Sequence, residues 1–180
     1  TKLTGNQNTA VGAQAGFLLQ GTAENNNLFG FGAGKAMTTA AHNVCFGVNA
    51  GAGVTTGDSN ILIGGNTAGI AALTGDNNIV IGDSAGEQLT SGNNNVFIGL
   101  STGVNTVAVT TGLQNIVIGK QARMNAVDGE NQISLGAFVT CQGNNNFTIG
   151  NGATDSNIAF GATSITAPSD ERYKEEIETS

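Results

Sequence analysis

This sequence has little charge, few aromatic residues and almost no proline. Charged side chains make up 11% of its 180 residues and aromatic ones 5%, tryptophan is absent, and one proline stands against 28 glycines. Globular domains usually contain about twice that share of charged residues, so the composition argues against a compact globular fold. The glycines do not recur at every third position, which excludes a collagen-like helix. Hydrophobic residues reach 39% and occur in phase with a repeat, so the chain is not plainly disordered.

Basic side chains are scarce as well. Six Lys and Arg residues stand against 13 Asp and Glu, which gives a formal net charge of −7. A surface this poor in lysine and arginine cannot neutralise many phosphates, so we expect no nucleic-acid partner. No apolar run approaches the length that crosses a membrane, so we expect no membrane insertion. Because the chain begins at Thr1 rather than methionine, we expect it to be a piece of a longer protein.

The residues that usually carry chemistry are few and scattered. Cys45 and Cys141 lie about five repeats apart, roughly 24 Å, whereas a disulfide needs Cα atoms within about 7 Å, so we predict two free thiols. No nucleotide-binding loop, zinc spacing or calcium repeat is present, and we expect no cofactor and no metal. We interpret His42, the single histidine, as a surface residue. Asp58 and Asp76 could align in neighbouring turns, but we interpret them as solvated surface rather than as a glycosidase pair.

A short phrase recurs along the chain: an asparagine, three mostly apolar residues and a glycine. The glycines that end its copies are Gly12, Gly30, Gly47, Gly64, Gly82, Gly99, Gly119, Gly136, Gly150 and Gly161. Successive spacings are 18, 17, 17, 18, 17, 20, 17, 14 and 11 residues. A near-constant period of this length is typical of a solenoid. We therefore predict an all-β, parallel β-solenoid or β-roll of about ten coils over residues 1–166, roughly 50 Å long. The last two spacings predict that the coils shrink, or give way to another architecture, after about Gly136.

Each copy predicts a short strand with two apolar faces. The first and third apolar residues share one face because side chains alternate along a strand, and β-branched residues dominate both positions. The middle residue, such as Leu62, Val80 or Phe97, points the other way. A strand that is apolar on both faces is normally covered on both. We assign the middle residues to the outer face and predict that sister copies of the chain cover them.

The residues outside the three apolar positions of each repeat also predict structural features. A small residue and a second glycine follow the turn and let neighbouring coils approach closely. A looser segment then supplies a Leu or Val that completes the interior. Stacked asparagines at Asn60, Asn78, Asn95 and Asn115 predict an amide ladder in which each side chain satisfies its neighbour.

The phrase Asn-φ-x-φ-Gly-x-x-Ala-Gly, in which φ is an apolar residue, resembles the head repeats of trimeric autotransporter adhesins, the YadA-like β-roll. The resemblance covers roughly residues 5–165, although the repeat of that family is shorter than 17–18 residues. It implies a left-handed parallel β-roll and a homotrimer, so the expected partners are two further copies of this chain.

The composition changes at Ala167-Pro168, where a charged segment begins. Residues 169–177 read SDERYKEEI, with Ser169 as an N-cap and acidic residues in the first turn. We predict that residues 167–180 form a junction and a short C-terminal helical start. Such a helix could simply cap the end of the solenoid.

The same segment resembles the opening of the endosialidase-type intramolecular chaperone, a self-cleaving peptidase domain of phage tail spikes and fibres. The resemblance implies that Ser169 is the nucleophile, that Lys174 is its activating base, and that the Ser169–Asp170 bond is cut. Asp170 and Arg172 belong to the cleavage junction. The body of the chaperone, on the order of a hundred residues, does not follow here, so we expect no enzyme activity apart from a single-turnover self-cleavage that needs that body.

Three functions remain. The first is a structural and host-receptor-binding segment of a trimeric phage tail fibre, located in the virion and matured by autocleavage of the C-terminal chaperone. Its partner would be a host cell-surface receptor, with a glycan as one class, bound at irregular turns such as 104–111. The second is the head of a trimeric adhesin on a bacterial cell surface. The third is an ice-binding solenoid, which ranks last because the threonines are out of strict register. The tail motif favours the first.

Overall fold

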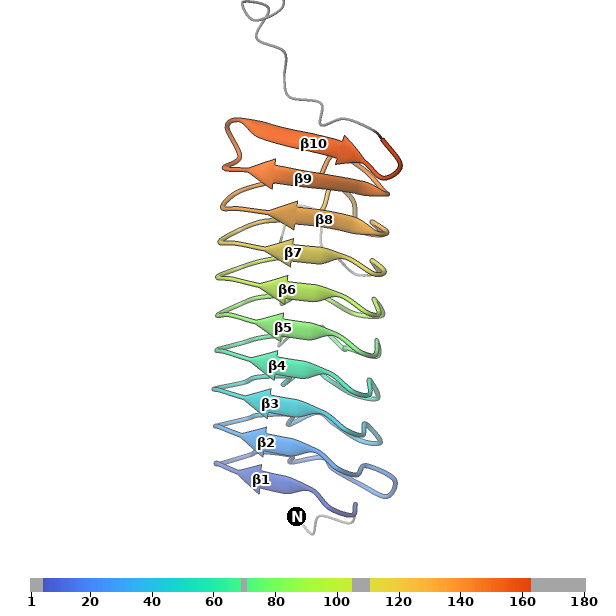
Figure 1. Cartoon of the computed structure of the whole chain (residues 1–180). Coiled ribbons are helices and arrows are strands. Elements are labelled where there is room, and N and C mark those ends of the chain that lie inside the picture. The colour runs from blue at the N-terminus through green and yellow to red at the C-terminus, as the bar shows by residue number, and fades with distance from the viewer. Residues whose placement is uncertain (1–4, 69–70, 105–110, 163–180) are drawn as a thin grey trace, which may run out of the picture.

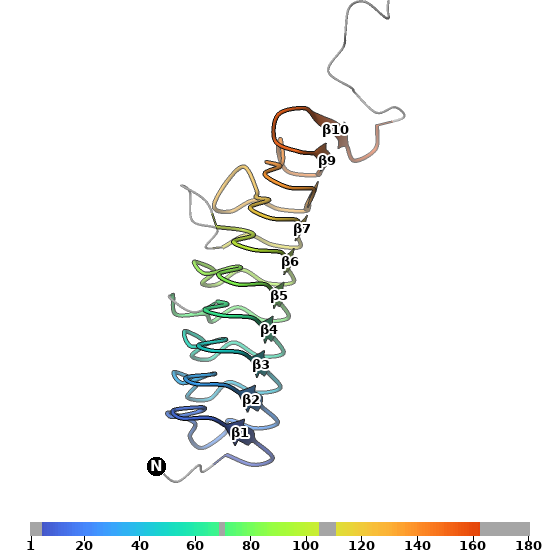
Figure 2. The same ribbon diagram turned by 90° about the vertical axis from the view of Figure 1, so that its left-hand side faces the viewer.

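The computed structural model describes residues 5–68, 71–104 and 111–162. The chain winds into a solenoid whose strands stack into a single ten-stranded sheet, from β1 at one end to β10 at the other (Figure 1). The strands are β1 (Thr9–Val11), β2 (Asn27–Phe29), β3 (Val44–Phe46), β4 (Ile61–Ile63), β5 (Ile79–Ile81), β6 (Val96–Ile98), β7 (Ile116–Ile118), β8 (Gln132–Leu135), β9 (Asn146–Gly150) and β10 (Asp155–Ala159). No helix occurs in these ranges. The strands line one side of the stack, and the turns and looser segments form the other side (Figure 2).

The register is constant along the parallel part of the sheet. Each strand from β1 to β8 pairs parallel with the next, so that the middle residue of one strand faces the middle residue of its neighbour, as Leu62 does with Val80 and Val80 with Phe97. This arrangement confirms the predicted all-β parallel solenoid. The repeated phrase sets the register because each copy ends at the same stacked glycine.

The predicted number of about ten coils is wrong at the C-terminal end. The chain makes about eight turns, because β10 reverses and pairs antiparallel with β9, Ile158 opposite Phe147. Parallel strands need a crossover of about a dozen residues or more, whereas a hairpin needs far fewer. The spacing of 11 residues from Gly150 to Gly161 therefore suits a hairpin. The predicted change of architecture after Gly136 occurs at this hairpin.

The middle residue of each strand points into the coil, not outward as we predicted. The middle residues of β2 to β7 are all 0% exposed: Leu28, Cys45, Leu62, Val80, Phe97 and Val117. The coil is narrow, because a Cβ on Gly86 would lie 2.9 Å from Val80 and one on Gly103 would lie 3.0 Å from Phe97. A strand of three residues can therefore send only its central side chain inward. The predicted Leu and Val residues of the looser segment complete this interior: Leu19, Val54, Leu73 and Leu89.

The predicted amide ladder is confirmed. The Oδ1 of Asn78 accepts hydrogen bonds from the backbone N–H and the Nδ2 of Asn95 at 3.0 and 3.1 Å. The Nδ2 of Asn78 donates to the Oδ1 of Asn60 at 3.0 Å and to the carbonyl oxygen of Gly92 at 2.9 Å. The ladder continues beyond the predicted residues to Asn8 at one end and to Gln132 at the other. Because these amides are buried, each bond also avoids an unsatisfied polar group.

Eight of the ten repeat glycines form one column beside the strands. From Gly12 to Gly136 their φ angles lie between 124° and 136°, a region that residues with a Cβ rarely adopt. A Cβ on Gly99 would lie 2.6 Å from the carbonyl oxygen of Gly119 in the next coil. The last two glycines differ: Gly150 ends β9 without a positive φ, and Gly161 has open space around it.

Both cysteines are buried free thiols, as predicted. Burial raises the pKa of Cys45 from 9.0 to about 12. The folded chain therefore holds the Cys45 proton more tightly than the unfolded chain, and its contribution to stability is complete below pH 9.0 and lost as the pH rises towards 12.

This shift predicts slow thiol labelling. At pH 8 the folded chain should contain about a thousandfold less Cys45 thiolate than an unfolded one, since the two pKa values are 9.0 and about 12. We expect a maleimide to label Cys45 only as fast as the chain unfolds. Peptide mass spectrometry measures the rate of this labelling. Labelling of the native chain at the rate measured in urea would contradict the buried position.

Candidate functional site

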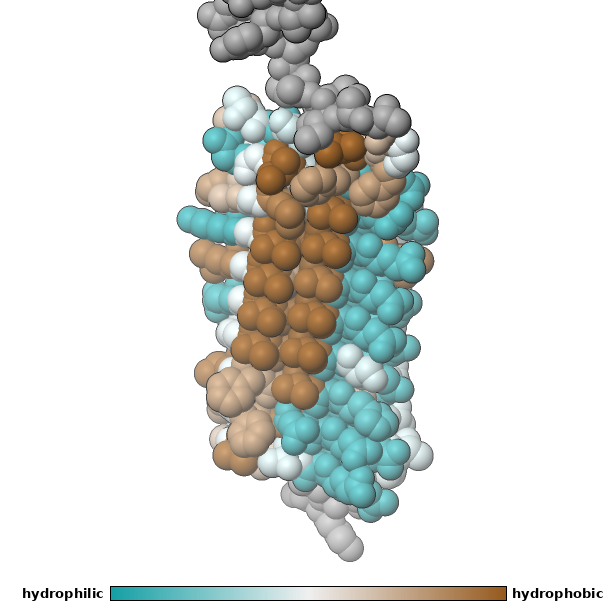
Figure 3. All heavy atoms as spheres, in the orientation of Figure 1, coloured by the Kyte–Doolittle hydropathy of each residue, from teal (hydrophilic) through white to brown (hydrophobic). Residues whose placement is uncertain are grey.

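The outer face of the sheet carries two files of apolar side chains, which together we call the apolar stripe. The entry file consists of Val44, Ile61, Ile79, Val96, Ile116 and Ile133, which are in register with the strand starts. The exit file consists of Val11, Phe29, Phe46, Ile63, Ile81, Ile98, Ile118 and Leu135, at the strand ends. Figure 3 shows the stripe as two adjoining hydrophobic columns along most of the sheet. These are the first and third positions of the repeat, which share a face as predicted but lie outside.

The apolar stripe is open to solvent in the single chain. Phe46 is 58% exposed and Val11 54%, while Ile61, Ile116 and Ile118 are each 37% exposed because stacked neighbours shield one another. At about 4.8 Å per strand and about 10 Å for the two files together, the stripe covers on the order of 400 Å². A continuous apolar patch of that size is commonly a binding surface. The stripe contains no charged residue.

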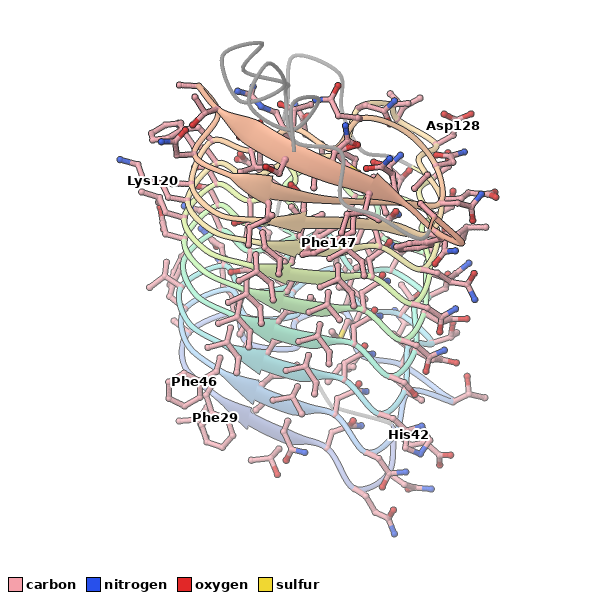
Figure 4. All side chains as sticks on the ribbon, turned by 45° about the horizontal axis from the view of Figure 1, so that its top comes forward. Phe29, His42, Phe46, Lys120, Asp128 and Phe147 are labelled. Carbon is pink, nitrogen blue, oxygen red and sulfur yellow. The ribbon has the colours of Figure 1, made fainter. Side chains whose placement is uncertain are left out.

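Different residues border the two sides of the stripe. Hydrophilic side chains lie on the side where the strands begin (Figure 3). On the side where the strands end, Phe29 and Phe46 of the exit file form the edge of the stripe and Lys120 also lies there, whereas His42 lies on the opposite side (Figure 4). The ammonium group of Lys120 stands 5.6 Å from the centroid of the Phe138 ring.

The hydrophilic side contains a row of residues with a left-handed backbone conformation, which our sequence analysis missed. The residue before each ladder position has a φ between 52° and 59°: Gln7, Asn25, His42, Ser59, Asn77, Asn94, Gln114 and Asn131. Asparagine tolerates this conformation better than most residues. The repeated Asn-Asn dipeptides, as at 77–78 and 94–95, carried this signal. His42 is exposed, as predicted, with its Nε2 3.3 Å from the Nδ2 of Asn25.

Asp58 and Asp76 do align in neighbouring coils, but they are more than solvated surface. The Oδ1 of Asp76 accepts a hydrogen bond from the backbone N–H of Asp58 at 2.8 Å, and that of Asp58 accepts from Ala41 at 2.7 Å. Asn93 continues the row by accepting from the N–H of Asp76 at 2.7 Å. Each carboxylate therefore satisfies the backbone of the preceding coil, which gives both a structural role.

Two kinds of feature are absent from the part of the chain that the structure describes. No three His, Cys, Asp or Glu side chains in this part gather so that they could hold a metal ion. The same part contains no apolar helix of membrane-crossing length.

Several predicted features lie outside the described residues. They are Ser169, Asp170, Arg172 and Lys174, together with the boundary at 166–167 and the helical start at 167–180. Of the predicted receptor-binding insertion, only Val104 and Thr111 are described, and residues 105–110 are not. The self-cleavage site and this binding loop therefore stay predictions.

With the surface defined, the chain can be set against known proteins. It matches no protein-family model, no curated protein and no solved structure. The two resemblances in the repeat and the tail stay predictions as well.

Proposed function

We propose that this chain is a structural and host-receptor-binding segment of a trimeric phage tail fibre. The observation that carries the proposal is the apolar stripe, a flat and uncharged face about as long as the sheet. Two further copies of the chain are the partners whose surfaces match it, because each copy presents the same stripe. The trimer places the three stripes together and leaves the turns outside, where a receptor on the host cell can reach them.

The energy of burial supports an assembly of modest size. At about 25 cal/mol per Å², burying a patch on the order of 400 Å² contributes about 10 kcal/mol per chain. Association costs an estimated 4–15 kcal/mol in lost freedom of movement, so the burial of the stripe is of the same order as that cost. Residues that border the stripe, such as Phe31 and Val48, which are 50% and 55% exposed, would add to the interface.

The fibre is favoured over the alternatives by the tail motif. A chaperone junction at Ser169–Asp170 belongs to fibres that mature by self-cleavage, and it locates the protein in the virion. A trimeric adhesin head on a bacterial surface would use the same stripe but continue into a stalk and a membrane anchor. Reading the gene beyond Ser180 tests this choice: a chaperone-type domain supports the fibre, and a coiled coil with an anchor contradicts it.

An ice-binding role has less support. Ice binders present a regular threonine array on a flat face, whereas the flat face here carries isoleucine and valine. The hydroxyl groups of Thr38 and Thr74 donate to the backbone carbonyls of Thr55 and Thr90 at 3.2 and 3.4 Å, in the looser segment.

The trimer predicts a native mass near three times the 18.0 kDa of one chain, measured by light scattering coupled to gel filtration. Ile81→Lys places a charge in the middle of the stripe, where burial is costly, and should reduce the mass to that of a single chain. Phe17→Lys removes an apolar group outside the stripe that is 52% exposed, more than Ile81, and should leave the trimer intact. A wild-type mass of 18.0 kDa, or an Ile81→Lys trimer as stable as the wild type, would overturn the proposal.

A further inference from the structure

The turn between β9 and β10 contains the single Asn-Gly dipeptide of this chain, Asn151-Gly152. It lies on the side where the parallel strands end (Figure 1), and both residues are exposed. The fold requires the glycine, because its φ is +82° and a Cβ there would lie 2.8 Å from the Cβ and from the carbonyl oxygen of Phe138. Without a Cβ, the nitrogen of Gly152 is also less hindered than that of any other residue.

The groups in this turn suit an attack of the Gly152 nitrogen on the side-chain carbonyl carbon, Cγ, of Asn151. The Oδ1 of Asn151 accepts hydrogen bonds from the backbone N–H groups of Ala153 and Thr154, both at 3.1 Å. Donors at this oxygen stabilise the negative charge that develops on it during the attack. The N–H of Gly152 donates to the Oδ1 of Asp155 at 2.8 Å, so a carboxylate is in place to take its proton. The turn therefore holds an electrophile, a nucleophile and a base together.

We infer that Asn151 is a self-modification site, at which the chain deamidates with water as the only co-reactant. The Gly152 nitrogen bonds to Cγ of Asn151, and its proton passes to Asp155 and on to the departing Nδ2. The Cγ–Nδ2 bond breaks, ammonia leaves, and a five-membered succinimide remains. Water then opens this ring at either carbonyl and gives aspartate or isoaspartate. A single chain suffices for the reaction, so it does not depend on the proposed trimer.

The asparagines of the amide ladder are protected from the same reaction. Asn78 is 0% exposed, so water does not reach it, and its Nδ2 is held by Asn60 and Gly92 at 3.0 and 2.9 Å. The nitrogen that would attack belongs to Ile79, whose N–H donates to the carbonyl of Asn95 at 2.8 Å. The β-branched side chain of Ile79 crowds that nitrogen further. The same residue type is therefore inert in the ladder and reactive in the turn.

The products change the end of the sheet. Both place a new negative charge in the turn that Asp155 closes, and isoaspartate also lengthens the main chain by one carbon before Gly152. Because Gly152 lies against Phe138, the longer chain displaces the turn. The pairing of Gly150 with Asp155, next to the turn, is the first of the hairpin to be lost.

Peptide mapping by mass spectrometry tests the site. The full chain is incubated at mildly alkaline pH, folded in buffer or unfolded in urea, and asparagine, aspartate and isoaspartate are quantified at each position over time. We expect Asn151 to convert several-fold faster in the folded chain than in the unfolded one, because only the folded turn supplies the base and the donors. Asn78 should stay unchanged in the folded chain. Conversion of Asn151 that is equal or slower in the folded chain would overturn the inference.

Asp155→Asn tests the base separately. Asparagine still offers an oxygen to the N–H of Gly152 but takes up no proton, so conversion of Asn151 should slow several-fold in the folded chain and stay unchanged in urea. Asp58→Asn makes the same change of charge away from the turn and should leave the rate as in the wild type. An Asp155→Asn chain that converts as fast as the wild type would contradict the role of the carboxylate.

Discussion

Gly99→Ala is expected to lower the free energy of unfolding by about 3–5 kcal/mol, combining backbone strain with steric overlap. The φ of Gly99 is +136°, and a Cβ would lie 2.6 Å from the carbonyl oxygen of Gly119 and 2.7 Å from the Oγ1 of Thr102. The backbone cannot easily shift, because the N–H of Gly99 donates to the carbonyl of Ile81 at 2.8 Å and that of Gly119 to Ile98 at 2.8 Å. The coils on both sides hold the glycine in place.

Two control variants separate the causes of this loss. Gly21→Ala introduces a Cβ at a φ of +48° with nothing within 4 Å, and Gly143→Ala does so in open space without a positive φ. Urea unfolding at one fixed chain concentration should give a moderate loss for Gly21→Ala and almost none for Gly143→Ala. A Gly99→Ala chain as stable as Gly21→Ala would show that the close stacking of the glycine column is not a constraint.

Asn78→Leu is expected to cost about 4 kcal/mol, because buried polar groups that lose a partner cost about 1–3 kcal/mol each. Leucine has the same number and branching of heavy side-chain atoms as asparagine, but its methyl groups are bulkier, so overpacking adds to the loss of the hydrogen bonds. The backbone N–H of Asn95 loses its acceptor at 3.0 Å, and the carbonyl of Gly92 loses its donor at 2.9 Å. Hydrogen exchange should accelerate at the Asn95 amide before other amides of the same coil.

The control for the ladder is Asn93→Leu. Asn93 is half-buried and accepts one bond from the N–H of Asp76 at 2.7 Å, so its replacement should cost about 1 kcal/mol. Equal losses for Asn78→Leu and Asn93→Leu in urea unfolding would contradict a special role for the buried ladder.

The repeat allowed much of the fold to be predicted from sequence, because spacing and residue type are visible without coordinates. The spacing of the glycines predicted stacked parallel strands, and Asn60, Asn78, Asn95 and Asn115 predicted the ladder that the structure shows. The direction of the strand faces was not predictable in this way. Alternation shows that Ile79 and Ile81 share a face, but when both faces are apolar it does not show which one is inside. The narrowness of the coil decides that.

The reversal at β10 could have been predicted from the spacing alone. A spacing of 11 residues from Gly150 to Gly161 is too short for another parallel crossover. The apolar stripe was predicted only indirectly, as an apolar outer face assigned to the wrong residues. The anchoring of Asp58 and Asp76 to backbone N–H groups depends on the exact stacking of turns, which no local pattern encodes.

The constant register of β1 to β8 means that the protein can change its reach in fixed increments. Each repeat contains one phrase that runs from a ladder asparagine to a column glycine, and it contacts only the repeats on either side. Removal of the whole repeat that carries β5 would bring β4 against β6 in the same register, with isoleucine or valine again at both outer positions. The rod would shorten by about 4.8 Å and keep its cross-section. Recombination between repeats therefore offers a simple way to alter how far such a rod extends while its lateral surface stays the same.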